Sequence, residues 1–488
     1  MITKKQRRLF SVSGVFALGF FVFWGSISVP NVEATSGAWE NVGTSILGSN
    51  GGYPMLAFNP LTYEPHIVYR DNTNNLRATV KKFDGSSWSD VGTPGMSYAS
   101  ASYTQIALSS SGDPYVSYRD NARSGKASVL KYQSDTNWQY VGEETFSDGG
   151  VSYLRLAFNP LTDEPYAAYA DNSWQNLVVV KKFNGSSWEN VGNPGVSEGS
   201  IITLSLAFNP STGEPYLAYG DSVYSNKAVV KKWNGSSWET VGTAGFSSSD
   251  AGYIAIAFHP ETFEPYVVFE DGTDGGYKAT VMKFTGSSWE YVGNPRFTTD
   301  SAWDPSIAFC PSTNEPYIAF GDESQSSKAS VMKFNGSGWS LVGSAGFSEG
   351  DAILGNSLVF DPFTKEPFLT FVDGGGSGSQ IVVWKYDKAV LSPAVMAYSA
   401  KKTKRKLNFT FQDMNRSIKK SKVTIRINGK KLKLSRARKS GLNTIVSGTL
   451  NHKNWARGSY DAVISMKYKI GRTTRTKTWT SENALTIE

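Results

Sequence analysis

Seven aspartates recur at an almost constant spacing, and carboxylates are the residues from which acid–base chemistry would be expected first. Glycoside hydrolysis, for example, needs two carboxyl groups in unlike environments. A residue that occupies the same place in every copy of a repeat has the same environment each time. The pattern therefore predicts a structural role, in which each side chain accepts hydrogen bonds from backbone N–H groups of the following turn. No catalytic residue is predicted. The seven residues, at steps of 49 to 51, are Asp71, Asp120, Asp171, Asp221, Asp271, Asp322 and Asp373.

Three arginines break this repetition, and a binding site needs such asymmetry. Arg70 and Arg119 directly precede the recurring aspartate in the first two copies, where the other copies carry Ala, Gly, Glu or Val. Arg155 lies in the first apolar run of the third copy. Guanidinium groups bind carboxylate or phosphate in a fork geometry. We predict that the three arginines face an anionic ligand such as a uronic or sialic acid. The alternative is that each pairs with an aspartate of a neighbouring copy.

Aromatic residues at the start of the first run form a second candidate group. They are a possible stacking platform for sugars, although they could equally fill gaps between copies. The group consists of Tyr53, Tyr103, Tyr153, Tyr253 and Trp303.

Other common chemistries find little support. His66, His259 and His452 are too few for a histidine-rich metal site, and the single Cys310 excludes an intramolecular disulfide. Serine-hydrolase, zinc-protease and phosphate-loop motifs do not occur. We therefore predict neither a metal nor a cofactor.

The elements that must position these residues follow from the repeat itself. One copy, at residues 154–192, holds four short alternating apolar runs, separated by Asn-Pro and Asn-Gly turn signals. Four short strands in a repeat of about fifty residues are typical of one propeller blade. Seven copies predict an all-β, seven-bladed propeller.

The fourth strand of each blade carries a Trp, but the seventh copy ends without one. The missing strand precedes the first copy, at Trp39. The N-terminal strand is therefore predicted to complete the last blade and to close the ring, which covers an open sheet edge. Trp39 is assigned a structural role.

Strand direction predicts which face binds. The loops that enter the first strand and leave the second share one face, and both vary between copies, whereas the NPxTxEP and NGSS loops opposite are nearly constant. Variable loops on a rigid scaffold are the usual place for binding.

The motifs FNPxTxEPYxAYxD and KxxVxKFNGSSWExVG, over residues 39–386, resemble secreted bacterial seven-bladed propellers of the kelch-, sialidase- and lectin-like group. The resemblance implies a propeller. The sialidase Asp-box spacing is not met, which argues against that activity.

The ends of the chain predict export and a second domain. Lys4, Lys5, Arg7 and Arg8 precede an apolar run, so residues 1–34 read as a signal peptide, or alternatively as an uncleaved anchor. The propeller is assigned to 35–388, a linker to 389–393, and an Ig-like β-sandwich to 394–488, whose late strands resemble bacterial Ig-like modules. Residues 401–488 contain 23 Lys and Arg against 4 Asp and Glu. This basic domain could bind an anionic cell-envelope polymer, remain a solvated surface, or dock on the acidic propeller. Nucleic acid is the least favoured partner.

These patterns predict a monomeric extracellular or cell-surface binding protein that recognises a glycan or a protein through its variable loops. An extracellular polysaccharide-active enzyme, either a glycosidase or a lyase, and a structural envelope component are the alternatives.

Overall fold

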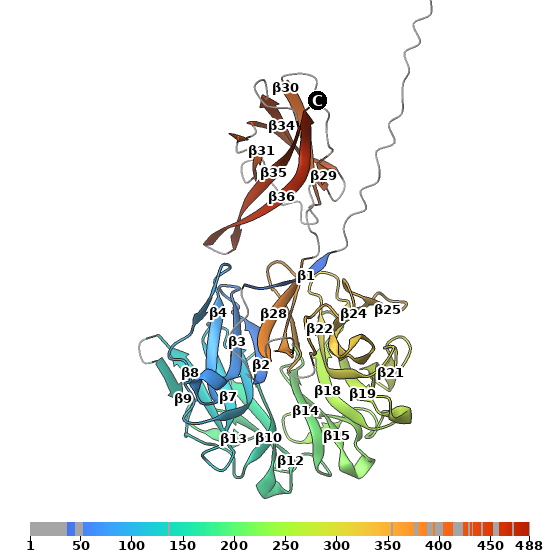
Figure 1. Cartoon of the computed structure of the whole chain (residues 1–488). Coiled ribbons are helices and arrows are strands. Elements are labelled where there is room, and N and C mark those ends of the chain that lie inside the picture. Colours follow the sequence, from blue (N-terminus) through green and yellow to red (C-terminus); the bar gives the residue numbers. More distant parts are fainter. Residues whose placement is uncertain are drawn as a thin grey trace, which may run out of the picture. The chain divides into compact units, whose positions relative to one another are not determined.

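The computed structural model describes residues 37–43, 52–134, 137–352, 355–374 and 379–387, and eight strands beyond residue 393. Its larger part is a propeller of seven four-stranded antiparallel sheets, or blades, which follow one another in chain order around a common axis (Figure 1). The predicted all-β, seven-bladed fold is confirmed. The predicted signal peptide (1–34) and linker (389–393) lie outside the described residues.

Each blade runs outward from the axis in the order inner, second, third and outer strand. The inner strands are β2 (Gly52–Phe58), β6 (Ala101–Leu108), β10 (Val151–Phe158), β14 (Ile201–Phe208), β18 (Ala251–Phe258), β22 (Ala302–Phe309) and β26 (Ser357–Phe360). The second strands are β3 (Pro65–Asp71), β7 (Pro114–Asp120), β11 (Pro165–Asp171), β15 (Pro215–Asp221), β19 (Pro265–Asp271), β23 (Pro316–Asp322) and β27 (Pro367–Asp373).

The outer half of each blade consists of a third strand at least as long as the second and a short outer strand of three or four residues. The third strands are β4 (Arg77–Phe83), β8 (Lys126–Gln133), β12 (Leu177–Phe183), β16 (Lys227–Trp233), β20 (Lys278–Phe284), β24 (Lys328–Phe334) and β28 (Gln380–Asp387). The outer strands are β5 (Trp88–Asp90), β9 (Asn137–Tyr140), β13 (Trp188–Asn190), β17 (Trp238–Thr240), β21 (Trp289–Tyr291), β25 (Trp339–Leu341) and β1 (Ala38–Asn41). Short 3₁₀ turns leave the second strand in five blades: η1 (Asn72–Asn74), η2 (Asn172–Trp174), η3 (Ser222–Tyr224), η4 (Thr273–Gly275) and η5 (Glu323–Gln325).

The core lies between the blades. Every residue of β11, β15, β19, β23 and β27 is buried, because each second strand has strand neighbours on both sides and a blade packed on each face. A large aromatic side chain fills the centre of each gap with almost no exposed surface; these are Tyr69, Tyr118, Tyr169, Tyr219, Phe269, Phe320 and Phe371.

The outer-strand tryptophans join neighbouring blades. Each indole Nε1–H donates to a valine carbonyl that follows the outer strand of the preceding blade, at 2.7 to 3.0 Å. A buried indole N–H needs such a partner. The tryptophan in each copy therefore links its blade to the preceding one, both by packing and by a hydrogen bond.

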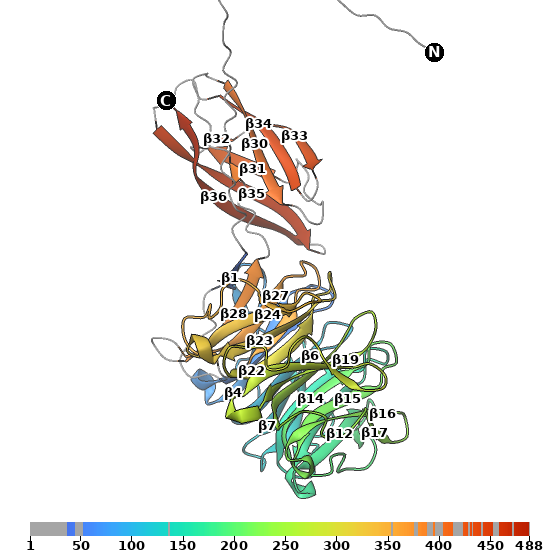
Figure 2. The ribbon, with the colours of Figure 1, turned by 90° about the vertical axis from the view of Figure 1, so that its right-hand side faces the viewer.

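Ring closure follows the prediction. Strand β1 pairs antiparallel with β28, from Ala38 opposite Asp387 to Asn41 opposite Trp384, and completes the sheet β1-β28-β27-β26. The two strands lie side by side in Figures 1 and 2. Trp39 donates to the Val342 carbonyl at 2.7 Å. Trp39 therefore links the last blade to the sixth blade by the same hydrogen bond that the other tryptophans make between consecutive blades.

The recurring aspartates hold turns, as predicted. In the first six copies, Oδ1 of the aspartate accepts the backbone N–H two residues later, at 2.9 to 3.2 Å. In the seventh copy, Asp373 instead accepts the N–H groups of Glu349 and Gly350 from the preceding loop. All seven side chains are buried.

The strands beyond residue 393 form two further antiparallel sheets. Their orders are β29-β30-β34-β33 and β32-β31-β35-β36. The assignment of this region as Ig-like stays a prediction. Among all the residues described, no helix has the length and apolar character of a membrane span. The eight strands are β29 (Ala394–Val395), β30 (Lys404–Gln412), β31 (Val423–Ile427), β32 (Lys430–Lys431), β33 (Lys433–Ser440), β34 (Asn443–Asn451), β35 (Gly458–Ile470) and β36 (Thr473–Ile487).

Candidate functional site

The loops that enter the inner strands and those that leave the second strands meet at one edge of the propeller, which we call the entry face. Backbone hydrogen bonds join the two sets, for example from Asn172 N to Gly150 O and from Ser222 N to Ser200 O. At the opposite edge, Asn59 Oδ1 accepts the N–H groups of Leu61 and Thr62, and its amide donates to the next blade. The constant loops therefore have a structural role.

Four tyrosines lie at the entry end of the inner strands. Each sits at a β-bulge with a left-handed backbone: φ is +53° at Tyr53, +51° at Tyr103, +55° at Tyr153 and +40° at Tyr253. The first three form a continuous row, with ring centroids 5.4 and 6.0 Å apart. Tyr53 and Tyr253 keep 37% and 50% of their surface exposed, so rings are available to a ligand.

Trp303 does not join this row. It pairs with Gly321, as Gly252 pairs with Glu270, and so stands one register position before the tyrosines. Its indole N–H donates to the carboxylate of Glu323 at 2.8 Å. The bulge position of the sixth blade is held by Asp304, with φ +48°. The residue predicted to stack thus gives way to a carboxylate.

The three predicted arginines occupy different surroundings. The Arg70 guanidinium lies 5.3 Å from the ring centroid of Tyr53. The Arg119 side chain packs over Gly125. Arg155 lies deeper on β10 and donates one hydrogen bond, to the Leu154 carbonyl. Within the described part of the chain, none of the three forms an ion pair with a carboxylate.

Arg155 attracts the carboxyl group of Asp304 on the sixth blade, and Asp304 in turn contacts Glu270 of the fifth blade. Asp304 accepts hydrogen bonds from Gly355 N at 2.6 Å and Asn356 N at 3.2 Å, and Glu270 accepts one from Asp304 N at 2.9 Å. Burial raises the pKa of Glu270 to about 8. Burial also raises the pKa of Asp304, against those hydrogen bonds and the attraction of Arg155. Burial lowers the pKa of Arg155, while Asp304 raises it.

These groups belong to one site. Burial raises the pKa of Tyr253, and so do the charges of Asp304 and Glu270. We define the axial mouth as the tyrosines of blades one, two, three and five together with Arg155, Glu270 and Asp304. Sequence reasoning missed the two carboxyl groups, because they come from different blades and neither belongs to a repeated motif.

A second candidate site lies between blades one and two, where the side chain that packs on the outer tryptophan differs from that in other gaps. In four gaps, a Phe of the entry loop stacks on the outer tryptophan of the next blade, with centroids 4.3 to 4.5 Å apart and planes within 17°; the pairs are Phe146–Trp188, Phe246–Trp289, Phe297–Trp339 and Phe347–Trp39. Between blades one and two this position holds Met96, and a thin, flexible side chain replaces the ring. The indole of Trp138 therefore lacks the aromatic cover that those four tryptophans have, and between blades three and four the same position holds Val196.

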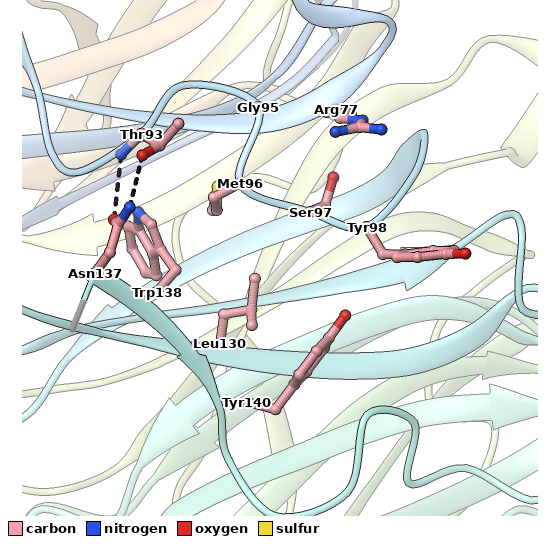
Figure 3. Close-up of a pocket in the computed structure, with 10 residues that line it drawn as sticks. All are labelled: Arg77, Thr93, Gly95, Met96, Ser97, Tyr98, Leu130, Asn137, Trp138 and Tyr140. Carbon is pink, nitrogen blue, oxygen red and sulfur yellow. Dashed lines mark hydrogen bonds between the residues drawn. The ribbon is translucent and has the colours of Figure 1, made fainter.

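A pocket of about 570 Å³ opens at this place. We call it the Trp138 pocket. Figure 3 shows Trp138, Met96 and Leu130 on one side of the open space and Ser97, Tyr98 and Tyr140 on the other, with Arg77 above the rim. Its size lies within the usual range for small-molecule sites.

One arginine fixes the rim of the Trp138 pocket. The Arg123 guanidinium lies 3.9 Å from the ring centroid of Tyr98, donates to Tyr140 Oη at 3.0 Å and pairs with Asp120 and Glu144. Arg123 thus holds two aromatic rings in place and takes its countercharge from the two acids. Tyr98 remains 58% exposed.

The sequence contained a signal for this pocket. Met96 stands before Ser97 where four other copies have Phe before Ser or Thr. Which tryptophan that residue covers becomes clear only in the folded ring. In the part of the chain that the structure describes, no group of three or more His, Cys, Asp or Glu side chains could hold a metal ion.

Comparison with one solved structure supports the fold, and two further structures match less closely. The chain is similar in structure to the BP39L lectin from Burkholderia pseudomallei, with a TM-score of 0.50, 12% identity, and coverage of 70% of this chain and 98% of that one. A protein of unknown function from Dyadobacter fermentans matches with a TM-score of 0.42, 11% identity and coverage of 71% and 98%. A mutant of the Aleuria aurantia lectin, in complex with α-methyl-L-fucoside, matches with a TM-score of 0.39, 16% identity and coverage of 61% and 96%. No protein-family profile and no curated protein sequence matches the chain.

Proposed function

We propose that this protein binds glycans and that one sugar ring occupies the Trp138 pocket. The observation that carries the proposal is the missing ring over Trp138. In four other gaps a flat six-membered ring lies 4.3 to 4.5 Å from the equivalent indole. The C–H face of a pyranose is a similarly flat, weakly polar surface, and it can occupy that position.

The rim of the pocket suits the hydroxyl groups of a sugar. Tyr98 and Tyr140 offer phenolic oxygens, and Arg77 offers an exposed guanidinium. An apolar floor with a few polar groups at the edge is the usual composition of a small-ligand site. The fold is also that of a protein named a lectin, although a fold by itself does not decide function.

The test fills the pocket with the ring that the other blades carry. Met96→Phe should restore the stacked pair and leave the fold intact, while affinity on an array of neutral and acidic glycans falls by about tenfold or more. Met96→Leu keeps the pocket open and should bind as the wild type does. Undiminished glycan binding by a correctly folded Met96→Phe protein would assign recognition to another place.

A specific observation also favours a second candidate, a polysaccharide-active enzyme. Glu270 and Asp304 are two neighbouring carboxyl groups in unlike hydrogen-bond environments, the arrangement on which acid–base chemistry depends. Release of reducing ends or unsaturated products from polysaccharides would support this function, and binding without turnover supports the first. A structural envelope component would neither bind nor turn over the glycans.

Location and the basic region belong to the same proposal. We place the protein outside the cell or on its surface, on the basis of the export signal predicted at residues 1–34. Residues 394–488 would then attach it to an anionic envelope polymer through their excess of Lys and Arg.

A further inference from the structure

The axial mouth retains tyrosine at positions where the backbone would favour glycine. A left-handed φ is disfavoured for a residue with a side chain, because Cβ comes too close to the following carbonyl oxygen. The seventh blade shows the less strained solution, because Gly355 occupies the corresponding position with φ +72°. Tyr53, Tyr103, Tyr153 and Tyr253 therefore carry a backbone cost that the fold itself does not require. Strain of this kind gathers at functional sites.

The strained bulges place the rings against one another and leave part of them exposed. The row from Tyr53 through Tyr103 to Tyr153 spans three blades, and Tyr253 joins the mouth from the fifth. Exposed rings on several inner strands form a platform that one flat ligand could contact along several edges.

Beneath the rings, hydrogen-bonding capacity is unused. Arg155 carries five N–H donors and gives one hydrogen bond within the described chain, to Leu154 O. Asp304 is held in position by two backbone N–H groups, and a carboxylate can accept further bonds. A fixed acceptor and a donor with spare N–H groups thus lie within electrostatic reach of one another.

Two backbone N–H groups that donate to Asp304 favour the ionised form of its carboxylate, which can therefore act as a countercharge for Arg155. Arg155 and Asp304 attract one another without forming a direct ion pair, and Glu270 retains its proton because burial raises its pKa to about 8. An acidic ligand would be attracted by Arg155 but repelled by Asp304. A cationic ligand would be attracted by Asp304 but repelled by Arg155. A hydroxyl group can donate to Asp304 and accept from Arg155 without either cost.

We infer that the axial mouth is a second carbohydrate site, selective for an uncharged sugar residue whose ring lies on the tyrosines and whose hydroxyl groups bridge Arg155 and Asp304. This deepens the proposed glycan-binding function and rests on it. It also replaces the anionic ligand predicted from the arginines with a neutral one, because Asp304 already supplies the countercharge.

The experiment isolates the axial mouth by using Met96→Phe protein, in which the Trp138 pocket is filled. Calorimetry and saturation-transfer NMR then measure binding of a panel of neutral methyl hexosides and of the matching uronosides. Neutral sugars should bind at least about tenfold more tightly than their uronosides. Adding Arg155→Met should abolish that binding, and Leu161→Ala on the opposite face should leave it unchanged.

The Tyr103→Gly variant separates a loss of binding from a loss of folding. Glycine suits the left-handed backbone, so this variant should remain folded while its affinity for neutral hexosides falls at least about tenfold. The inference is overturned if Met96→Phe protein binds no neutral hexoside, if it prefers uronosides, or if folded Tyr103→Gly and Arg155→Met proteins bind as well as their parent. Loss of all binding in Met96→Phe alone removes the axial site but leaves the Trp138 pocket standing. If Met96→Phe protein binds as fully as the wild type and loses that binding when Tyr103→Gly is added, the axial site stands and the Trp138 pocket is removed.

Discussion

Closure of the ring by β1 can be tested by a deletion whose cost follows from the contacts. Removing residues 35–43 takes away Trp39, which is 8% exposed and stacks on Phe347 with centroids 4.5 Å apart. Loss of a buried Trp costs about 3–5 kcal/mol. Loss of its 2.7 Å hydrogen bond to Val342 O adds about 1 kcal/mol. We therefore expect about 4–6 kcal/mol from this side chain, before the strand pairing with β28 is counted.

The assay separates this local loss from the loss of the strand. Trp188→Ala removes an equivalent indole, stacked on Phe146 at 4.3 Å and bonded to Val141 O at 2.7 Å, but leaves every strand in place. It should match Trp39→Ala in denaturant unfolding. Only the deletion should also expose the edge of β28 and promote association, seen by light scattering. A deleted protein that stays monomeric and melts at the wild-type temperature would refute the closure argument.

Three further outcomes are expected. Glu270→Gln should abolish a pH dependence of stability. The folded state keeps the Glu270 proton up to about pH 8, whereas the unfolded chain releases it near its ordinary pKa, so wild-type stability should fall by a few kcal/mol as pH rises through that window. Urea titrations at pH 4 to 9 should show this fall for the wild type and not for the variant. Asp171→Ala should cost about 1–3 kcal/mol, because Ser173 N and Gly149 N lose a fully buried acceptor; an unchanged unfolding midpoint would contradict the turn-holding role. Replacing the Lys and Arg residues of 430–439 by Ser should lower the salt concentration at which the intact chain elutes from an anionic polymer, and elution that ignores salt would exclude an electrostatic contact.

The fold was predictable because each blade repeats the same physical solution. The alternating apolar runs, the Asn-Pro and Asn-Gly turns and the one Trp per copy all predict the same four-stranded blade. Trp39, which precedes the first copy, indicated where the ring closes. Such patterns depend only on residues close together in the sequence. Because the repeat occurs seven times, an irregular copy does not hide the pattern.

The candidate sites were harder to predict because they depend on departures from the repeat. One additional residue between Tyr253 and the next copy shifts the register, so that Asp304 takes the position assigned to Trp303. Glu270 and Asp304 stand on different blades, and their hydrogen bond depends on the bulge geometry. No spacing rule relates them. The substitution at Met96 was visible in the sequence, but its consequence depends on which indole it faces.

The two proposed sites share a segment, and this has a consequence for the ligand. The loop that carries Met96, Ser97 and Tyr98 leads directly into β6, which carries Tyr103. This loop belongs to the entry face, because it enters an inner strand, and it contributes residues to both sites. A ligand with several sugar residues could therefore contact both sites, and two weak contacts on one molecule bind more tightly than either alone. The protein would then select a chain of sugars by its length as well as by its composition, with a neutral residue required at the axial mouth.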